Sequence, residues 1–171
     1  MKTYLYTSLF LLLIGAAFSQ KTSKNVSRGT MQNARSKDSI TILKSFDFSK
    51  GSWKLLGEAY GGKYVSFKLK ENGVKANLSD HFMIQENRDL EIFKRGFLGK
   101  ETKHNGTTGE IILRLVKDDK VVWEGSVFLF KGYCILRTGE IEYSISYKAL
   151  NSLVYSKPIS QSEYSNIVFK K

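Results

Sequence analysis

Few residues in this chain could carry out acid–base or nucleophilic chemistry. It contains two histidines, His81 and His104, and one cysteine, Cys134. A serine or cysteine nucleophile needs a nearby base and a group that orients this base. Cys134 with either histidine would meet part of that need in a small secreted hydrolase, but no Gly-x-Ser-x-Gly elbow is present. The sequence therefore predicts no catalytic residue and favours a protein that is not an enzyme.

The carboxylates and histidines also form no metal-binding signature. Zinc sites take three or four His, Cys or carboxylate ligands, and calcium sites take a cluster of oxygen ligands. The nearest approach is Asp80-His81, with Glu86 and Asp89 downstream. The acidic pair at 118–119 is typical of a hairpin turn. We therefore expect neither a metal site nor a cofactor.

Aromatic and basic residues are the remaining candidates for binding. The chain has nine Tyr, eleven Phe and two Trp. It contains 27 Lys and Arg and 16 Asp and Glu, which gives a net charge of +11. Such a charge favours anionic partners, and aromatic rings with polar tips are common at binding surfaces. The residues that we expect to contact a ligand are Trp53, Tyr60, Tyr64 and Trp123.

The triplet Gly51-Ser52-Trp53 lies just before a strand near the start of the expected domain. It resembles the first motif of the lipocalins and their calycin relatives, in which the Trp closes one end of a barrel. The resemblance implies a closed barrel that holds an apolar small molecule, with Trp53 at its floor. The alternative is a core tryptophan after a turn glycine, and the sequence leaves both open.

Alternation of apolar and polar residues predicts the secondary structure. Residues 63–70 alternate, and the apolar members of the run are Val65, Phe67 and Leu69. This pattern predicts a half-buried strand. An Asn-Gly pair at 72–73, before another alternating run, predicts a hairpin turn because a type I′ turn needs positive φ at both central residues.

The same pattern recurs downstream, in the strand-like segments 90–98, 110–117, 121–130, 133–137 and 140–147. Short strands at regular spacing with turns between them favour a sandwich or a barrel. The fold class that we predict is all-β, a single antiparallel β-sandwich or closed β-barrel of about 8–10 strands. At the C-terminus, 160–163 fits a helix capping box, whereas 166–169 would serve as a last strand.

The N-terminus has the features of a secretory signal over residues 1–19. Lys2 supplies the positive charge, 9–18 is apolar, and Ala17 and Ser19 place small residues before a cut at Gln20. The apolar run is short for a transmembrane anchor. We therefore expect cleavage near Ser19 and Gln20, a secreted or periplasmic location, and no transmembrane span in the mature chain.

The mature chain divides into a leader and a domain. Residues 20–38 are basic and poor in large apolar side chains, which predicts a disordered leader. Residues 39–171 form the single all-β domain. Cys134 lies in an apolar run and has no second cysteine to pair with inside the chain, which predicts a buried thiol. A free reactive thiol, or a disulfide to another molecule, is the alternative.

These observations favour an exported, non-enzymatic binding protein with an unknown ligand. The ligand would be an apolar small molecule in a barrel cavity, or an acidic glycan or protein on an aromatic and basic face. Export argues against nucleic acid as the partner. The alternatives are a cell-envelope structural or interaction protein that works through a sheet edge or its leader, and a small secreted hydrolase.

Overall fold

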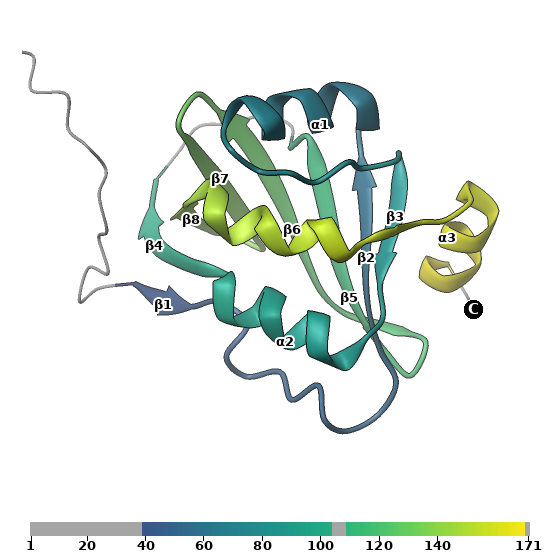
Figure 1. The fold of residues 1–171 in the computed structure, drawn as a ribbon. Coiled ribbons are helices and arrows are strands. Elements are labelled where there is room, and N and C mark those ends of the chain that lie inside the picture. Colours follow the sequence, from purple (N-terminus) through teal and green to yellow (C-terminus); the bar gives the residue numbers. More distant parts are fainter. Residues whose placement is uncertain (1–38, 104–108, 170–171) are drawn as a thin grey trace, which may run out of the picture. The chain divides into compact units, whose positions relative to one another are not determined.

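The computed structural model describes residues 39–103 and 109–169. They form one antiparallel sheet of nine strands in the order β1-β4-β8-β7-β6-β5-β2-β3-β9 (Figure 1). The strands are β1 (Ile40–Thr41), β2 (Trp53–Ala59), β3 (His81–Ile84), β4 (Leu98–Thr102), β5 (Ile111–Lys117), β6 (Lys120–Phe130), β7 (Tyr133–Thr138), β8 (Ile141–Ile145) and β9 (Lys157–Pro158). The helices are α1 (Gly62–Glu71), α2 (Asn87–Gly96), the 3-10 helix η1 (Tyr147–Tyr155) and α3 (Gln161–Val168).

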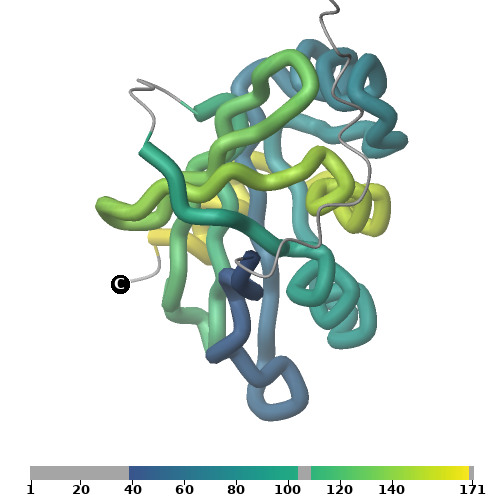
Figure 2. The backbone as a smooth tube through the Cα atoms, turned by 90° about the vertical axis from the view of Figure 1, so that its left-hand side faces the viewer, coloured from purple at the N-terminus to yellow at the C-terminus, as the bar shows by residue number. Residues whose placement is uncertain are grey.

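The predicted antiparallel β class is confirmed, and the sheet is open rather than closed into a barrel. Its edges are the two-residue strands β1 and β9. Three helices, α1, α2 and η1, lie on one face of the sheet (Figures 1 and 2). The main core forms between these helices and the sheet, so burial of the apolar face does not require the sheet to close.

The hairpin predicted around 72–73 is wrong, because residues 62–71 form helix α1. The buried positions Val65 and Leu69 are four apart, which is the helical period, while the alternating Phe67 faces solvent. Gly73 has φ +82° and stands just past the helix. The N–H of Val74 bonds to the carbonyl of Leu69, a typical glycine C-terminal cap. The Asn-Gly pair therefore ends a helix instead of turning a hairpin.

The strand predicted over 90–98 is also mostly wrong, because α2 occupies its first part. Leu90, Phe93 and Phe97 are all buried and follow the i, i+3, i+7 spacing of one helix face. The rings of Phe93 and Phe97 stack with their centroids 4.5 Å apart. Only β4, which begins at Leu98, continues as a strand.

The strands predicted between residues 110 and 147 are confirmed as β5 to β8. Consecutive members pair antiparallel through short turns. Asp118 and Asp119 both take positive φ, 49° and 61°, in the turn between β5 and β6. This geometry fits the primed turns that match the twist of a two-stranded hairpin.

At the C-terminus the helix forms rather than a strand. The Ser160 hydroxyl accepts a hydrogen bond from the N–H of Glu163 at 3.1 Å and caps α3. The helix covers a second, smaller core on the opposite face of the sheet from α1 and α2, made by Leu56, Met83, Val116 and Tyr164. None of the helices within residues 39–103 and 109–169 combines the length and apolar content that a membrane crossing requires.

Cys134 lies in the main core and is fully buried. Burial raises the pKa of its thiol to about 12. Because the thiolate is the reactive form, we expect no labelling by a thiol reagent at pH 8 in the folded protein and complete labelling after unfolding in guanidinium. Rapid labelling of the folded chain, followed by mass spectrometry, would contradict the buried position.

Candidate functional site

The structure brings two of the four expected ligand-contacting residues together. Tyr60 lies two residues before α1 and Tyr64 lies on its first turn. Their exposed fractions are 50% and 58%, high values for aromatic residues. Both side chains are therefore available at the end of the molecule that carries α1.

The two tryptophans lie elsewhere and pack inside the fold. Trp53 is 5% exposed, and its indole N–H donates to the carbonyl of Lys50 at 2.7 Å. Its ring meets Phe46 and Phe48 edge to face, at 5.9 and 5.1 Å. Trp123 is half-buried against Phe97. Trp53 therefore occupies the position of a core tryptophan, one of the two alternatives that the sequence left open.

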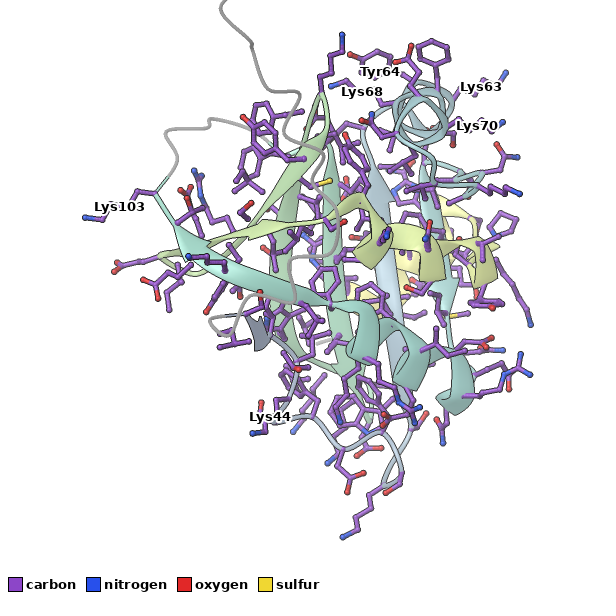
Figure 3. The ribbon with its side chains drawn as sticks, turned by 60° about the vertical axis from the view of Figure 1, so that its left-hand side comes forward. Lys44, Lys63, Tyr64, Lys68, Lys70 and Lys103 are labelled. Atoms are coloured by element: carbon purple, nitrogen blue, oxygen red, sulfur yellow. The ribbon has the colours of Figure 1, made fainter. Side chains whose placement is uncertain are left out.

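Helix α1 displays a third aromatic residue that the sequence analysis placed inside. Phe67 is 58% exposed, and Lys63 and Lys70 are exposed on the same helix. We call Tyr60, Lys63, Tyr64, Phe67 and Lys70 the α1 platform. Figure 3 shows the labelled lysines of α1 grouped around Tyr64, well away from Lys44. Helical spacing, rather than alternation, was the signal that would have found Phe67.

An ion pair fixes α1 against the sheet below the α1 platform. The ammonium of Lys68 lies 2.6 Å from Oε1 of Glu110 and also donates to the carbonyl of Leu129 at 3.2 Å. The other oxygen of Glu110 accepts the N–H of Leu129 at 2.9 Å. The hydrogen bond from Lys68 to Glu110 raises the pKa of Lys68, so its charge persists at neutral pH. The same ammonium lies 5.2 Å from the ring centroid of Tyr64.

Further hydrogen bonds hold both ends of α1. The N–H of Gly62 donates to the Asp80 carboxylate at 2.7 Å, and the Ser66 hydroxyl accepts the N–H of Leu78 at 2.7 Å. At the other end the Asn72 amide donates to Lys68 and accepts from the N–H of Gly132. Gly132 lies in the β6–β7 turn, which carries the exposed Lys131. This turn therefore adds another lysine beside the helix.

We expect Glu110→Ala to destabilise the domain by about 1–3 kcal/mol, because Lys68 would lose its charged partner and the N–H of Leu129 would lose its acceptor. Urea unfolding followed by circular dichroism measures this loss. The matched control is Glu71→Ala, which removes an exposed carboxylate from the end of α1. Equal stabilities of the two variants would show that the ion pair does not hold α1.

Of the residues considered for hydrolysis, the two that the structure describes, His81 and Cys134, are not brought together. His81 lies on β3 and faces the side of the sheet that α3 covers, where its ring centroid is 4.7 Å from that of Tyr164. Cys134 lies in the main core, on the opposite face. His104 falls outside the described residues. No group of three or more His, Cys, Asp or Glu side chains suited to a metal occurs in the parts of the chain that are described.

His81 borders a polar cluster that fastens α3 to the sheet. Arg114 bonds Glu124 at 2.7 Å and Glu58 at 3.3 Å, and also contacts the Tyr164 hydroxyl. That hydroxyl donates to Glu58 at 3.1 Å. The Arg114 side chain is 14% exposed and has acidic partners on two neighbouring strands. Through these interactions, Arg114 and Glu58 bind Tyr164 and hold α3 on the sheet.

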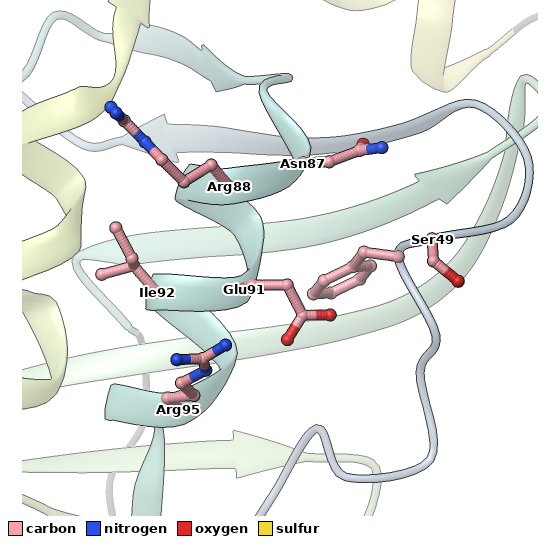
Figure 4. A pocket seen from close by; sticks show the side chains of 7 residues that line it. Ser49, Asn87, Arg88, Glu91, Ile92 and Arg95 are labelled. Atoms are coloured by element: carbon pink, nitrogen blue, oxygen red, sulfur yellow. The ribbon is translucent and has the colours of Figure 1, made fainter.

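A pocket of about 460 Å³ lies beside α2 (Figure 4). The residues that line it are Phe48, Ser49, Asn87, Arg88, Glu91, Ile92 and Arg95. Arg88 pairs with Asp89, and Glu91 pairs with Lys94. The pocket therefore combines two guanidinium groups with a carboxylate, and the hydroxyl of Ser49 donates to the Asp47 carboxylate at 2.6 Å. It belongs to a different helix from the α1 platform.

Comparisons with known proteins found no match. No family model, curated protein or solved structure matches the chain.

Proposed function

We propose that this chain is an exported, non-enzymatic binding protein that holds an anionic ligand on the α1 platform. The observation that carries the proposal is one helix that exposes Tyr64 and Phe67 between Lys63 and Lys70. Large apolar side chains gathered on a surface and flanked by charge often mark binding sites. The net charge of +11 over the whole chain favours an anionic partner.

The way α1 is anchored supports binding on a preformed surface. Lys68, Ser66 and Gly62 all hold the inner side of the helix to the rest of the fold. The exposed side chains therefore project from a fixed backbone. Binding to a preformed site avoids the entropy cost of ordering it.

The other interpretations receive less support. Capture of an apolar molecule in a barrel would require a closed sheet. The sheet is open, and its helix-covered face is packed by side chains. Partner binding through a sheet edge would use β1 or β9, which are two residues each, and short edges are poor templates for strand addition. For hydrolysis, His81 and Cys134 lie on opposite faces.

The proposal is tested with dextran sulfate as a polyanion and neutral dextran as its control. The chain from residue 20 should bind dextran sulfate in a salt-dependent way. Lys63→Gln with Lys70→Gln should weaken this binding about thirtyfold, at roughly 1 kcal/mol for each lysine near an anionic surface. The control pair is Lys120→Gln with Lys157→Gln, which removes the same charge at exposed sites away from α1. Equal weakening by both pairs would refute a site on α1.

A further inference from the structure

We infer that the anionic ligand of the α1 platform is the surface of a lipid bilayer. The rings of Phe67, Tyr64 and Tyr60 would enter the headgroup region, and Lys63 and Lys70 would meet lipid phosphates. This inference rests on the proposed function and names the partner class of the same site. The protein would dock from outside the bilayer without crossing it.

The chemistry of the platform fits lipid better than sugar. Phe67 carries no hydrogen-bonding atom, yet it is as exposed as Tyr64, at 58%. Tyrosine rings favour the membrane interface, where one end is apolar and the other is wet. Lysine side chains lay their methylene stems along apolar surface and keep the ammonium near the phosphates. These are the contacts that a peripheral helix makes with an anionic bilayer.

Recognition of a specific glycan would call for polar side chains that can bond its hydroxyl groups. Three polar side chains close to the platform are already engaged within the fold. The amide nitrogen of Asn72 donates to the Lys68 carbonyl, and its oxygen accepts from the N–H of Gly132. The Ser66 hydroxyl is buried against Leu78, and the Asp80 carboxylate accepts from Gly62. The exposed ammonium groups of Lys63 and Lys70 suit headgroup phosphates.

The order of residues along the helix places the rings between the charges. Lys63, Phe67 and Lys70 are spaced i, i+4 and i+7, so they share one stripe, and Tyr64 lies beside it. Val65 and Leu69 point the opposite way, into the core. Lys131 in the adjacent β6–β7 turn adds a further cation at this end of the sheet. An outward-facing helix with this order can lie flat on a charged interface.

Vesicle binding tests the inference on the chain from residue 20. Vesicles of phosphatidylcholine with phosphatidylglycerol should retain the protein on sedimentation, and pure phosphatidylcholine should not. Phe67→Ser should lower retention about tenfold or more, because it removes the ring that would be buried. The control is Val122→Ser, an exposed apolar residue at the end of β6 away from Lys131, and it should leave retention unchanged. Thermal melts check that both variants fold.

A second variant reports insertion directly. Phe67→Trp should give blue-shifted emission with the anionic vesicles, and brominated acyl chains should quench this emission. Retention on vesicles that Phe67→Ser leaves unchanged, or emission from the Phe67→Trp variant that does not respond to the vesicles, would overturn the inference. Binding to dextran sulfate without binding to vesicles would overturn it while leaving the proposed function intact. Failure to bind either probe would refute both.

Discussion

Replacing Gly57 with alanine should destabilise the domain by about 3 kcal/mol, the upper end of the usual cost of overpacking. Gly57 lies in the middle of β2, directly opposite Phe82 on β3. The Phe82 ring is fully buried and lies over Gly57, so an added Cβ would overlap it. Neither the buried ring nor the paired backbone can move away without loss elsewhere. Urea unfolding followed by circular dichroism measures the change.

A matched glycine separates this effect from a general cost of substitution. Gly96 ends α2, and a Cβ added there would meet only ordinary contacts at 3.8 Å or more. Gly96→Ala should therefore change stability little. In a Phe82→Ala background, Gly57→Ala should cost much less, because the overlapping ring is gone. Equal effects of the two glycine substitutions would mean that the ring does not occupy the space above Gly57.

Tyr164→Ala should cost about 3–5 kcal/mol and release α3 from the sheet. Tyr164 is 3% exposed, and it is the residue of α3 that is buried in the smaller core, with Ile167 and Val168 packed against that core. The substitution removes a buried ring, which costs about that amount for large aromatic residues. It also removes the hydroxyl that joins Glu58 and Arg114. Amide exchange over α3 should accelerate far more than exchange over β5 and β6; slow exchange in α3 would contradict its anchoring by Tyr164.

Tyr164 should also make stability depend on pH in the alkaline range. Burial raises its pKa to about 12, against about 10 in the unfolded chain. A raised pKa favours the neutral form in the folded state. The contribution is therefore complete below pH 10 and is lost as pH rises toward 12. Tyr164→Phe should flatten this part of the profile relative to the native chain, and parallel profiles would show that another group is responsible.

The sequence predicted the strands better than the helices, for a physical reason. From β5 to β8 the strands follow one another through short turns, so local alternation and turn residues suffice. In α1, the positions of Val65 and Leu69 fit both a strand and a helix. Phe67 lies midway between them, so the three apolar residues alternate as they would in a strand. The helix is favoured because Val65 and Leu69 are buried in the main core and because the N–H of Val74 donates to the Leu69 carbonyl at the end of the helix. Neither is visible in a local pattern.

The candidate site was predictable in part. Tyr60 and Tyr64 were named from their residue type and are exposed, whereas the exposure of Phe67 was missed because the strand interpretation turned it inward. The pairing of Lys68 with Glu110 joins residues 42 apart in sequence, so no local spacing reveals it. Trp53 and Trp123 were singled out for their ring size, which serves a core as well as a ligand.

The most direct test of the α1 platform is a map of backbone amide shifts by nuclear magnetic resonance. The chain from residue 20 would be titrated with dextran sulfate, and then with small bicelles that contain phosphatidylglycerol. We expect the largest shifts within residues 60–71 and in the β6–β7 turn at Lys131 and Gly132, with little change along α2. Shifts centred on the α2 pocket, or confined to residues 20–38, would contradict this expectation.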